Sequence, residues 1–472
     1  MKKSSTQIIK ELYTDFQFIF KKIKNDLLVV LILLFSGWKY TYGLKDFLDI
    51  YLYDESYYLY TGVKLTSLGL PVADGGLFYS IWYYSLSLLQ PDNIELYYLN
   101  FTIITILSPI LLYLVLRRYY VQIIPSLLVS FFFLISYANF PMLPKVSHFS
   151  LLVVLLSLVF ISYVKKSLLN SLAIASIGAL LSSYIRPELF LVFILLSLIY
   201  IGSLVYTFNR QNRSVFTILG VFILVSGGLI LSLGIPFGEN RSIVAFGQHF
   251  ALNWIDWTNE HQLSAWTNWE EIIYLNFGNI HSVKEALFAN PRIFFDHIFA
   301  NIFNTIKSLN ELIGLFFYHE NIFLPQKFIK IEAYILLVLV AAYIVKTRDL
   351  WFSQLNNRIK GNQNLLIILG CYLLISFIPI IIIYPRPHYF LLPGVIMMLI
   401  LAILVFENED KNSKFMGYKK MVLLCLIVIS ITPFASGYWT TTENRPNIIT
   451  ISFIETLQIN EEVNMLLADG GL

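Results

Sequence analysis

Charged side chains are scarce in this chain of 472 residues: 13% are Asp, Glu, Lys or Arg, whereas 57% are hydrophobic. The mean hydropathy of +0.68 lies outside the range of ordinary soluble domains. The formal net charge of +3 is too small to indicate nucleic acid as a partner. The scarcity of charge therefore argues against a soluble or nucleic-acid-binding domain and points to a lipid bilayer.

Cysteine is also scarce, and other common signatures are missing. The two cysteines, Cys371 and Cys425, both fall in apolar stretches, which excludes a disulfide framework or a cysteine-based metal site. There is no internal repeat, P-loop or G-x-G-x-x-G motif. Residues 1–26 lack a short apolar core followed by a cleavage site, and we interpret them as a retained, basic, amphipathic segment.

Long apolar runs, by contrast, occur throughout the chain. Spanning a bilayer takes roughly 20 apolar residues in a helix. Six stretches without any charge meet this length: Leu96–Leu116, Val121–Pro144, Leu189–Asn209, Ser214–Gly238, Gly361–Pro385 and Met421–Thr442. We predict an all-α polytopic membrane protein with about 11 transmembrane helices. They begin near Leu27, Leu96, Val121, His148, Leu168, Leu189, Ser214, Ile331, Leu365, His388 and Met421. The bundle is expected over residues 1–437, with a small extracytoplasmic tail at 438–472.

The basic residues predict the orientation. If the N-terminus is cytoplasmic, alternate short loops carry most of the 33 Lys and Arg residues, at 117–118, 165–166, 210–213, 346–360 and 411–420. This distribution follows the positive-inside rule for short loops. "GGLFYSIWYYSLSLLQP" (Gly75–Pro91) is uncharged but short. If it crossed the membrane, every later basic loop up to Lys420 would lie on the outer side. We therefore predict that it is an interfacial or re-entrant helix.

The same topology places polar and aromatic residues on the outer side. All seven histidines lie at the outer side or its boundary, as do all tryptophans except Trp351. The two long loops, at about 45–95 and 239–330, also lie there. Any chemistry is therefore expected on the extracytoplasmic face of the plasma (inner) membrane.

Four short stretches bring ionisable groups to that boundary. They supply Asp49, Asp54 and Glu55; Lys145 and His148; Arg186 and Glu188; and Arg386 and His388. Ionisable groups at membrane depth cost about 3 kcal/mol each, so they are found mainly where they pair, line a cavity or act.

Each group also has a structural interpretation. Asp54 and Glu55 could be a solvated pair that complements the dipole of a helix start. Arg186 with Glu188, and Arg386, could form structural ion pairs or extend to the interface. His148 and His388 could be hydrogen-bonded interface residues, and Lys145 alone is uninformative.

Taken together, the four stretches suit a reaction on an anionic lipid headgroup. A carboxylate can act as general base on an acceptor hydroxyl. Arginines can hold a phosphate and stabilise its charge as it leaves. On a helix, Asp54 and Glu55 point about 100° apart, so one can face the site while the other faces elsewhere.

The first outer loop resembles a known family. "YDESYYLYTGVKLTSLGLPVADGGLFYSIWYYSLSLL" is similar to the corresponding loop of the GT-C superfamily of membrane glycosyltransferases, with its "DE" pair, aromatic helix and "GLxP" element. The protein mannosyltransferase-like and aminoarabinose transferase-like branch is the most similar. "ADGGLFY" departs from the pattern because it lacks the proline usual before the "LY" element. The match covers about Asp49 to Arg118 and is weaker through "RPE" and "PRPHY".

The resemblance implies a GT-C-like bundle with outer loops and juxtamembrane helices, and a polyprenyl-phosphate-linked sugar as donor. The acceptor would be a hydroxyl of a glycan, lipid or protein. Asp54 would be the catalytic base and Glu55 its catalytic neighbour. Arg186, Arg386, His388 and Lys145 would bind the donor phosphate, with Asp49, His148 and Glu188 in support. No metal-ligand motif accompanies Asp54, although the superfamily includes both metal-dependent and metal-independent enzymes.

Two other functions share this topology. A transporter or flippase of lipid-linked saccharides would need charges inside the spans, lining a path through the bundle. A polysaccharide polymerase would share the location and the arginines. Because the charges gather at one boundary, we favour the transferase.

The Trp-rich part of the second loop has two interpretations. Trp254, Trp257, Trp266 and Trp269 form two i,i+3 pairs, with His249 and His261 nearby. They could stack on sugar rings, but the same spacing is typical of an amphipathic helix in the membrane interface, which we favour. His249, Asp256, Glu260 and His261 match no known metal-binding spacing.

Overall fold

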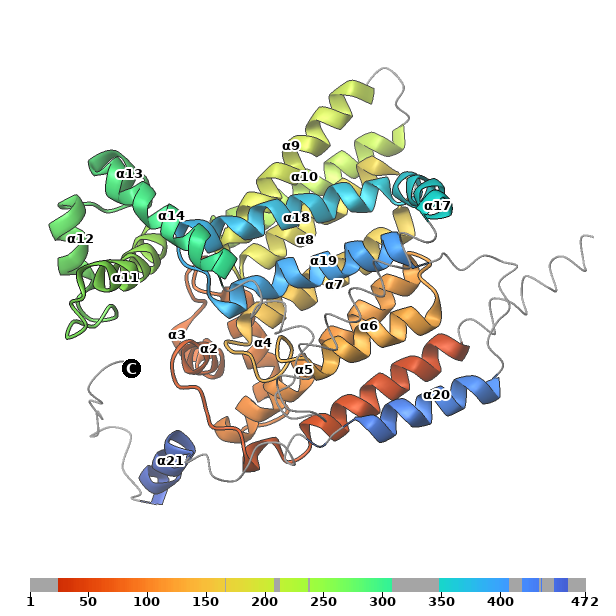
Figure 1. Ribbon diagram of the computed structural model, residues 1–472, viewed down its shortest axis with the longest axis horizontal. Helices are drawn as coiled ribbons and strands as arrows, with labels where there is room; N and C mark the ends of the chain where they lie inside the picture. Colours follow the sequence, from red (N-terminus) through yellow and green to blue (C-terminus); the bar gives the residue numbers. More distant parts are fainter. Residues whose placement is uncertain are drawn as a thin grey trace, which may run out of the picture.

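A computed structural model describes residues 24–165, 167–207, 213–236, 238–307, 348–406, 418–432, 434 and 445–456. Every regular element in these residues is helical. The long helices run roughly side by side (Figure 1). In order, they are residues 24–41, α5 (Asn93–Arg118), α6 (Ile123–Ile135), α7 (Val146–Val164), α8 (Leu168–Ser183), α9 (Phe190–Thr207), α10 (Arg213–Leu233), α18 (Gln363–Ile382), α19 (Leu391–Val405) and α20 (Tyr418–Ile431).

Seven of the described helices are long and apolar enough to cross a membrane. They are Lys24–Asp46, Asn93–Arg118, Val146–Val164, Pro187–Tyr206, Phe216–Leu233, Gln363–Ile382 and Pro387–Val405. Ile123–Ile135, Leu168–Ser183 and Val422–Ile431 are apolar but shorter. The span predicted near Ile331 lies outside the described residues, so the count of about 11 stays a prediction.

One predicted span is shorter than expected. The uncharged run from Val121 to Pro144 forms the helix α6 only as far as Ile135. Pro141 and Pro144 follow within the run. Because proline lacks an amide hydrogen and its ring clashes in a helix interior, these residues cannot extend the helix. The run therefore continues as an irregular segment that reaches the start of α7.

The main core lies between six helices. α7 packs between α5 and α8, α8 packs against α9, and α18 packs against α19, α8 and α9. Leu155, Leu172, Leu196, Leu369 and Leu399 are fully buried there. A smaller core joins residues 24–41 to α5, α6 and α20.

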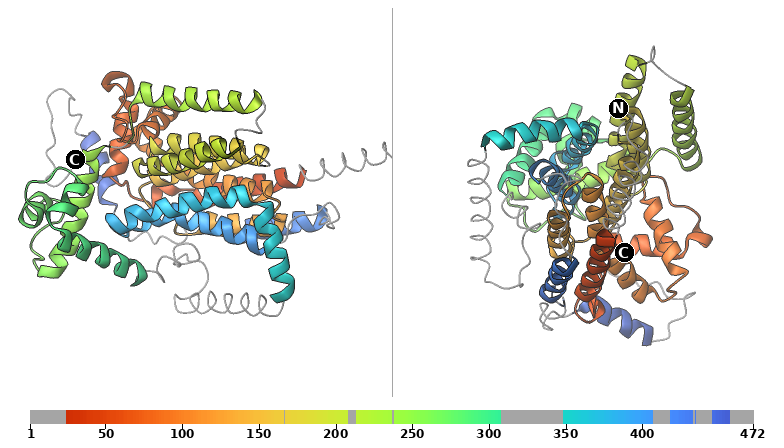
Figure 2. Two further views of the ribbon diagram at one scale, coloured as in Figure 1. Left: turned by 90° about the horizontal axis from the view of Figure 1, so that it is seen from above. Right: turned by 90° about the vertical axis from the view of Figure 1, so that its right-hand side faces the viewer.

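Eight further helices of the described residues gather at one end of the bundle. α2 (Asp54–Val63), α3 (Leu65–Leu68), α4 (Leu77–Ser87), α11 (Glu239–Thr258), α12 (Trp269–Phe277), α13 (Val283–Ala289), α14 (Pro291–Lys307) and α21 (Pro446–Thr456) lie there. α17 (Arg348–Gly361) lies at the other end, as both figures show (Figures 1 and 2). α4 has 11 residues, about 16 Å of helix, which is too short to cross a hydrocarbon core of about 30 Å.

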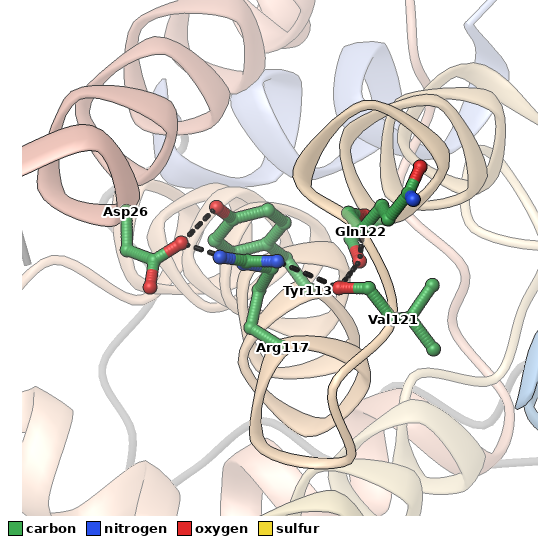
Figure 3. A network of polar contacts seen from close by, with 6 residues as sticks. Asp26, Tyr113, Arg117, Val121 and Gln122 are labelled. Atoms are coloured by element: carbon green, nitrogen blue, oxygen red, sulfur yellow. Dashed lines mark hydrogen bonds and ion pairs between the residues drawn. The ribbon is translucent and has the colours of Figure 1, made fainter. Parts of the chain in front are cut away.

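The opposite end holds a buried ion pair. Arg117 Nε lies 2.7 Å from Asp26 Oδ1, which also accepts a hydrogen bond of 2.7 Å from Tyr113 (Figure 3). Arg117 Nη1 donates to the carbonyl of Val121 at 2.6 Å. This network ties residues 24–41, α5 and the start of α6 together where the basic loops lie.

Candidate functional site

The two adjacent carboxylates of the "DE" pair open α2. Acidic residues in the first turn complement the helix dipole, which favours a helix start here. The loop before it is held by α5: the Tyr97 hydroxyl oxygen accepts a hydrogen bond of 3.1 Å from the amide of Tyr51, and the Tyr98 hydroxyl donates to the carbonyl of Leu48 at 2.6 Å. The helical rotation sends the two side chains in different directions: Asp54 is exposed, whereas Glu55 is 1% exposed.

Glu55 is the acceptor of a buried hydrogen-bond network. Its Oε1 accepts hydrogen bonds from the hydroxyls of Tyr79 and Tyr83, the latter at 2.7 Å, and from Asn100 Nδ2 at 3.3 Å. Its Oε2 accepts from the backbone amide of Lys145 at 2.8 Å. Burial raises the pKa of Glu55, although the bonds from the tyrosines oppose this shift. A single carboxylate thus joins α2 to α4, α5 and the start of α7.

The two tyrosines are themselves fixed as donors. Burial and the neighbouring Glu55 raise the pKa of Tyr79 and of Tyr83 well above the ordinary value. Asn100 Nδ2 donates to both phenol oxygens, at 2.7 and 2.9 Å, and its Oδ1 accepts from Trp82 Nε1 at 2.8 Å. Both hydroxyl protons are therefore directed to Glu55.

Lys145 lies inside the protein and not at the surface of a cavity. Its Nζ donates to the carbonyl of Asn139 at 2.7 Å and lies 4.0 Å from the centre of the Phe101 ring. Burial lowers its pKa well below the usual range, with the charge of Glu55 opposing the shift. This location gives the ammonium no access to a donor phosphate, because its partners are all internal.

A glycine allows α2 to approach α4 closely. A Cβ atom at Gly62 would lie 2.4 Å from Tyr83 Cβ and 2.7 Å from the carbonyl oxygen of Ser80. Real Cβ contacts are never this short, so only glycine fits. The close packing of the two helices keeps Glu55 within reach of the tyrosines on α4.

Asp54 lines a large open cavity of about 500 Å³. The other lining residues are Tyr53, Tyr57, Tyr58, Val72, Asp74, Gly75 and Arg241. The cavity thus lies between α2, the loop before α4 and the first turns of α11. Asp54 accepts no hydrogen bond from the described residues, so its carboxylate is available to a ligand.

Arg241 reaches the same cavity from α11. Its Nη1 donates to the backbone carbonyl of Asp74, and its Nη2 donates to the Tyr58 hydroxyl at 3.1 Å. Both acceptors are neutral, and a guanidinium carries five donor hydrogens. Arg241 therefore places an oriented cation on the wall of the cavity that Asp54 lines.

The "YIRPELF" and "YPRPHYF" turns meet at a second, much smaller cavity of about 30 Å³. Arg186, Glu188, His388 and Tyr389 line it together with Ser147 and Ser150. Arg186 is paired with Glu188 at 2.7 Å and lies 5.1 Å from the centre of the Tyr389 ring. The turns are brought together as expected, but the Arg186 charge is largely matched by Glu188.

Arg386 lies over an aromatic ring. Its guanidinium is 4.7 Å from the centre of the Trp266 ring. Its positive charge acts to lower the pKa of Tyr51, whereas the negative charge of Asp54 acts to raise it. Arg386 is thus between the Trp-rich segment and the loop that leads to Asp54.

Asp49 and His148 have structural partners. Asp49 accepts hydrogen bonds from the first amides of α21, with Oδ2 3.1 Å from Asn447 N and Oδ1 3.0 Å from Ile448 N. His148 Nε2 is 2.8 Å from the carbonyl of Ala138. Asp49 therefore attaches the C-terminal helix to the loop before α2, and His148 fixes the irregular segment before α7.

The four tryptophans of the Trp-rich segment differ in burial. Trp254 and Trp269 belong to the core of the α11–α14 cluster, and Trp266 contacts His249 edge to face at 5.8 Å. Burial and the charge of Arg386 lower the pKa of His249 to about 4. Trp257 and Trp266 are 43% and 46% exposed, so the interpretation as an interfacial face stays a prediction that concerns these two residues.

Asp74 and Arg241 are not among the site residues predicted from the sequence. Asp74 lies in "ADGG", whose one distinctive feature is the missing proline, and Arg241 lies in "NRSIVAF", which carries no motif for a catalytic or binding site. Asp74 is 20 residues from Asp54 within the same loop, whereas Arg241 is 187 residues away. Within the part of the chain that the structure describes, no group of three or more His, Cys, Asp or Glu residues is placed to hold a metal ion.

Comparisons with protein-family models, curated proteins and solved structures find no match, so the GT-C resemblance depends on the sequence motif alone.

Proposed function

We propose that this protein is a glycosyltransferase of the plasma membrane that moves a sugar from a polyprenyl-phosphate-linked donor to an acceptor hydroxyl on the extracytoplasmic face. The main support is the division of the "DE" pair: Asp54 lines an open cavity of about 500 Å³, while Glu55 is buried. A general base needs access to the proton it removes, and Asp54 has this access.

We propose the following reaction. The Asp54 carboxylate accepts the proton of the acceptor hydroxyl as that oxygen attacks the anomeric carbon of the sugar. The bond between the anomeric carbon and the phosphate oxygen breaks, and the electron pair leaves with the polyprenyl phosphate. We assign the stabilisation of this anion mainly to Arg386. Arg186, which is paired with Glu188, and His388 line the smaller cavity and are assigned a supporting role. Glu55 acts by holding α2 in place and not by contact with substrate.

The location of charge supports an enzyme over a flippase. In the seven candidate spans of the described residues, Asp, Glu, Lys and Arg lie only near the ends. A transport path through the bundle would require such groups along its length.

The test is transfer by purified protein from a polyprenyl-phosphate sugar to candidate acceptors. We expect Asp54→Asn to reduce turnover by roughly 10²-fold or more, because the amide keeps the shape but cannot accept the proton. Glu271→Gln on α12, an exposed carboxylate away from the cavity, is the matched control and should leave turnover unchanged. Full activity of Asp54→Asn would show that Asp54 is not the general base. Saccharide movement across vesicles without a new glycosidic bond would instead indicate the flippase.

A further inference from the structure

α14 has the reverse of the pattern expected for a helix in water. Its exposed side includes Phe295, Phe299, Phe303 and Ile306, of which Phe299, Phe303 and Ile306 are 64–67% exposed. These residues recur at intervals of three and four, so they form one stripe along the helix. We call these four residues the apolar stripe. Its opposite side buries polar groups, namely His297 and Asn301, beside Phe294.

The buried polar groups have specific partners at the end of α18. Asn301 Nδ2 donates to the carbonyls of Ile381 and Ile383, at 2.9 and 3.2 Å, and His297 Nε2 is 3.1 Å from the carbonyl of Ile382. The last carbonyls of a helix have no partner within it. In hydrocarbon, water cannot supply one, so each would cost several kcal/mol. α14 supplies them from its polar side.

This contact fixes the level of α14 relative to the bilayer. The candidate span Gln363–Ile382 ends at the very carbonyls that His297 and Asn301 bind. The figures show α14 extending from the end cluster to the end of α18, where the two helices pack together (Figures 1 and 2). The apolar stripe, on the other side of the same helix, is therefore level with the end of a membrane span.

Two of the charged residues of α14 lie at its ends. Arg292 is in the first turn, before the stripe begins, and Lys307 is in the last turn, after the stripe ends. Asp296 lies at the edge of the stripe, one residue after Phe295. A helix that lies in the interface plane has an apolar face toward the acyl chains and charges at its margins. The charge distribution thus fits lipid better than water or an acidic or basic protein partner.

We propose that α14 is half-embedded in the outer boundary of the bilayer, with the apolar stripe among phospholipid acyl chains. The α11–α14 cluster is thereby held against the membrane surface, and Arg241 on α11 keeps the Asp54 cavity at that surface. The proposal concerns contact with lipid and does not depend on the transfer reaction.

The test is the depth of spin labels in lipid nanodiscs of phosphatidylethanolamine and phosphatidylglycerol. Labels are attached at Phe299→Cys and Phe303→Cys in full-length protein with Cys371→Ser and Cys425→Ser. Lys284→Cys on α13, an exposed polar position, is the control. We expect the α14 labels to collide several-fold more with oxygen than with a water-soluble nickel chelate, relative to the control.

Each other outcome overturns the proposal. Nickel accessibility equal to that of Lys284→Cys would place the stripe in water, and labels reached by neither reagent would show that protein covers it. If the cysteine variants do not fold, photoactivatable phospholipid in the acyl region is cross-linked to the unchanged chain. Cross-links within residues 295–306 are then expected, and their absence alongside cross-links to the candidate spans would contradict α14 embedding. Transfer activity plays no part in either readout, so this proposal and the proposed function fail separately.

Discussion

At the scale of single residues, two neighbours of the same chemical kind have different tasks. Asp54 lines the open cavity, whereas Glu55 accepts four hydrogen bonds in the interior. The direction of each side chain follows from the 100° rotation per residue of a helix. The stability of the site therefore depends on one acid, and its proposed chemistry on the other.

Glu55→Ala should reduce the stability of the folded protein. The change leaves the hydroxyls of Tyr79 and Tyr83 and the amide of Lys145 without their acceptor. A buried polar group without a partner costs about 1–3 kcal/mol, so we expect a marked fall in melting temperature. Thermal unfolding in detergent measures this, with Glu271→Ala as the exposed control. Equal melting temperatures for the two variants would contradict the role of the network.

Glu55 should also make stability depend on pH. Because burial raises its pKa above the ordinary value of 4.5, the folded state binds more protons than the unfolded state between the two pKa values. The contribution of Glu55 is then fully present below the unfolded pKa and is lost as pH rises through the folded pKa.

This dependence is measured as the difference in melting temperature between wild type and Glu55→Gln across a pH series. The melting temperature of wild type should fall relative to that of Glu55→Gln as pH rises through the folded pKa of Glu55, because glutamine does not ionise. A difference that is constant with pH would show that Glu55 has the same pKa in both states.

At the scale of elements, the packing of α2 on α4 sets the position of Asp54. Gly62→Ala would place a Cβ against the Tyr83 side chain and the Ser80 carbonyl, and overpacking of this kind costs about 1–3 kcal/mol. We expect a lower melting temperature and reduced transfer, since the shift also moves Asp54. Gly202→Ala on α9, where a Cβ meets nothing within 4 Å, is the control and should be neutral or stabilising. Equal effects of both changes would contradict the close-packing argument.

Hydropathy predicts most of the helices but not the side-chain contacts between them. Ten of the predicted spans coincide with described helices because apolar composition is a local property. The "DE" motif likewise points to the pair of carboxylates that opens α2. The partners of Glu55, however, are 24 to 90 residues away along the chain, and Arg241 is 183 residues from its partner Tyr58. No local pattern could show that Lys145 is buried or that Arg241 faces Asp54.

At the scale of the whole molecule, the topology can be tested directly. The positive-inside distribution predicts a cytoplasmic N-terminus and an extracytoplasmic C-terminus. Single cysteines at Ser4 and Asp469, in a background without native cysteines, should therefore react with a membrane-impermeant reagent from opposite sides of the membrane. Reaction of both from one side would contradict this topology. Either the C-terminus would be cytoplasmic, or the N-terminus would be extracytoplasmic and the Asp54 cavity would face the cytoplasm.

The attachment of α21 to Asp49 has a consequence for biosynthesis. The amide of Asn447 and the carboxylate of Asp49 are 398 residues apart in the sequence. At a translation rate of about 5–20 residues per second, about 20–80 s separate the synthesis of the two partners. During that time the loop that leads to Asp54 has already emerged but lacks its final contact. The early segment thus gains its last contact from a late one, and a ribosome that stalls before residue 445 leaves the loop held by α5 but not by α21.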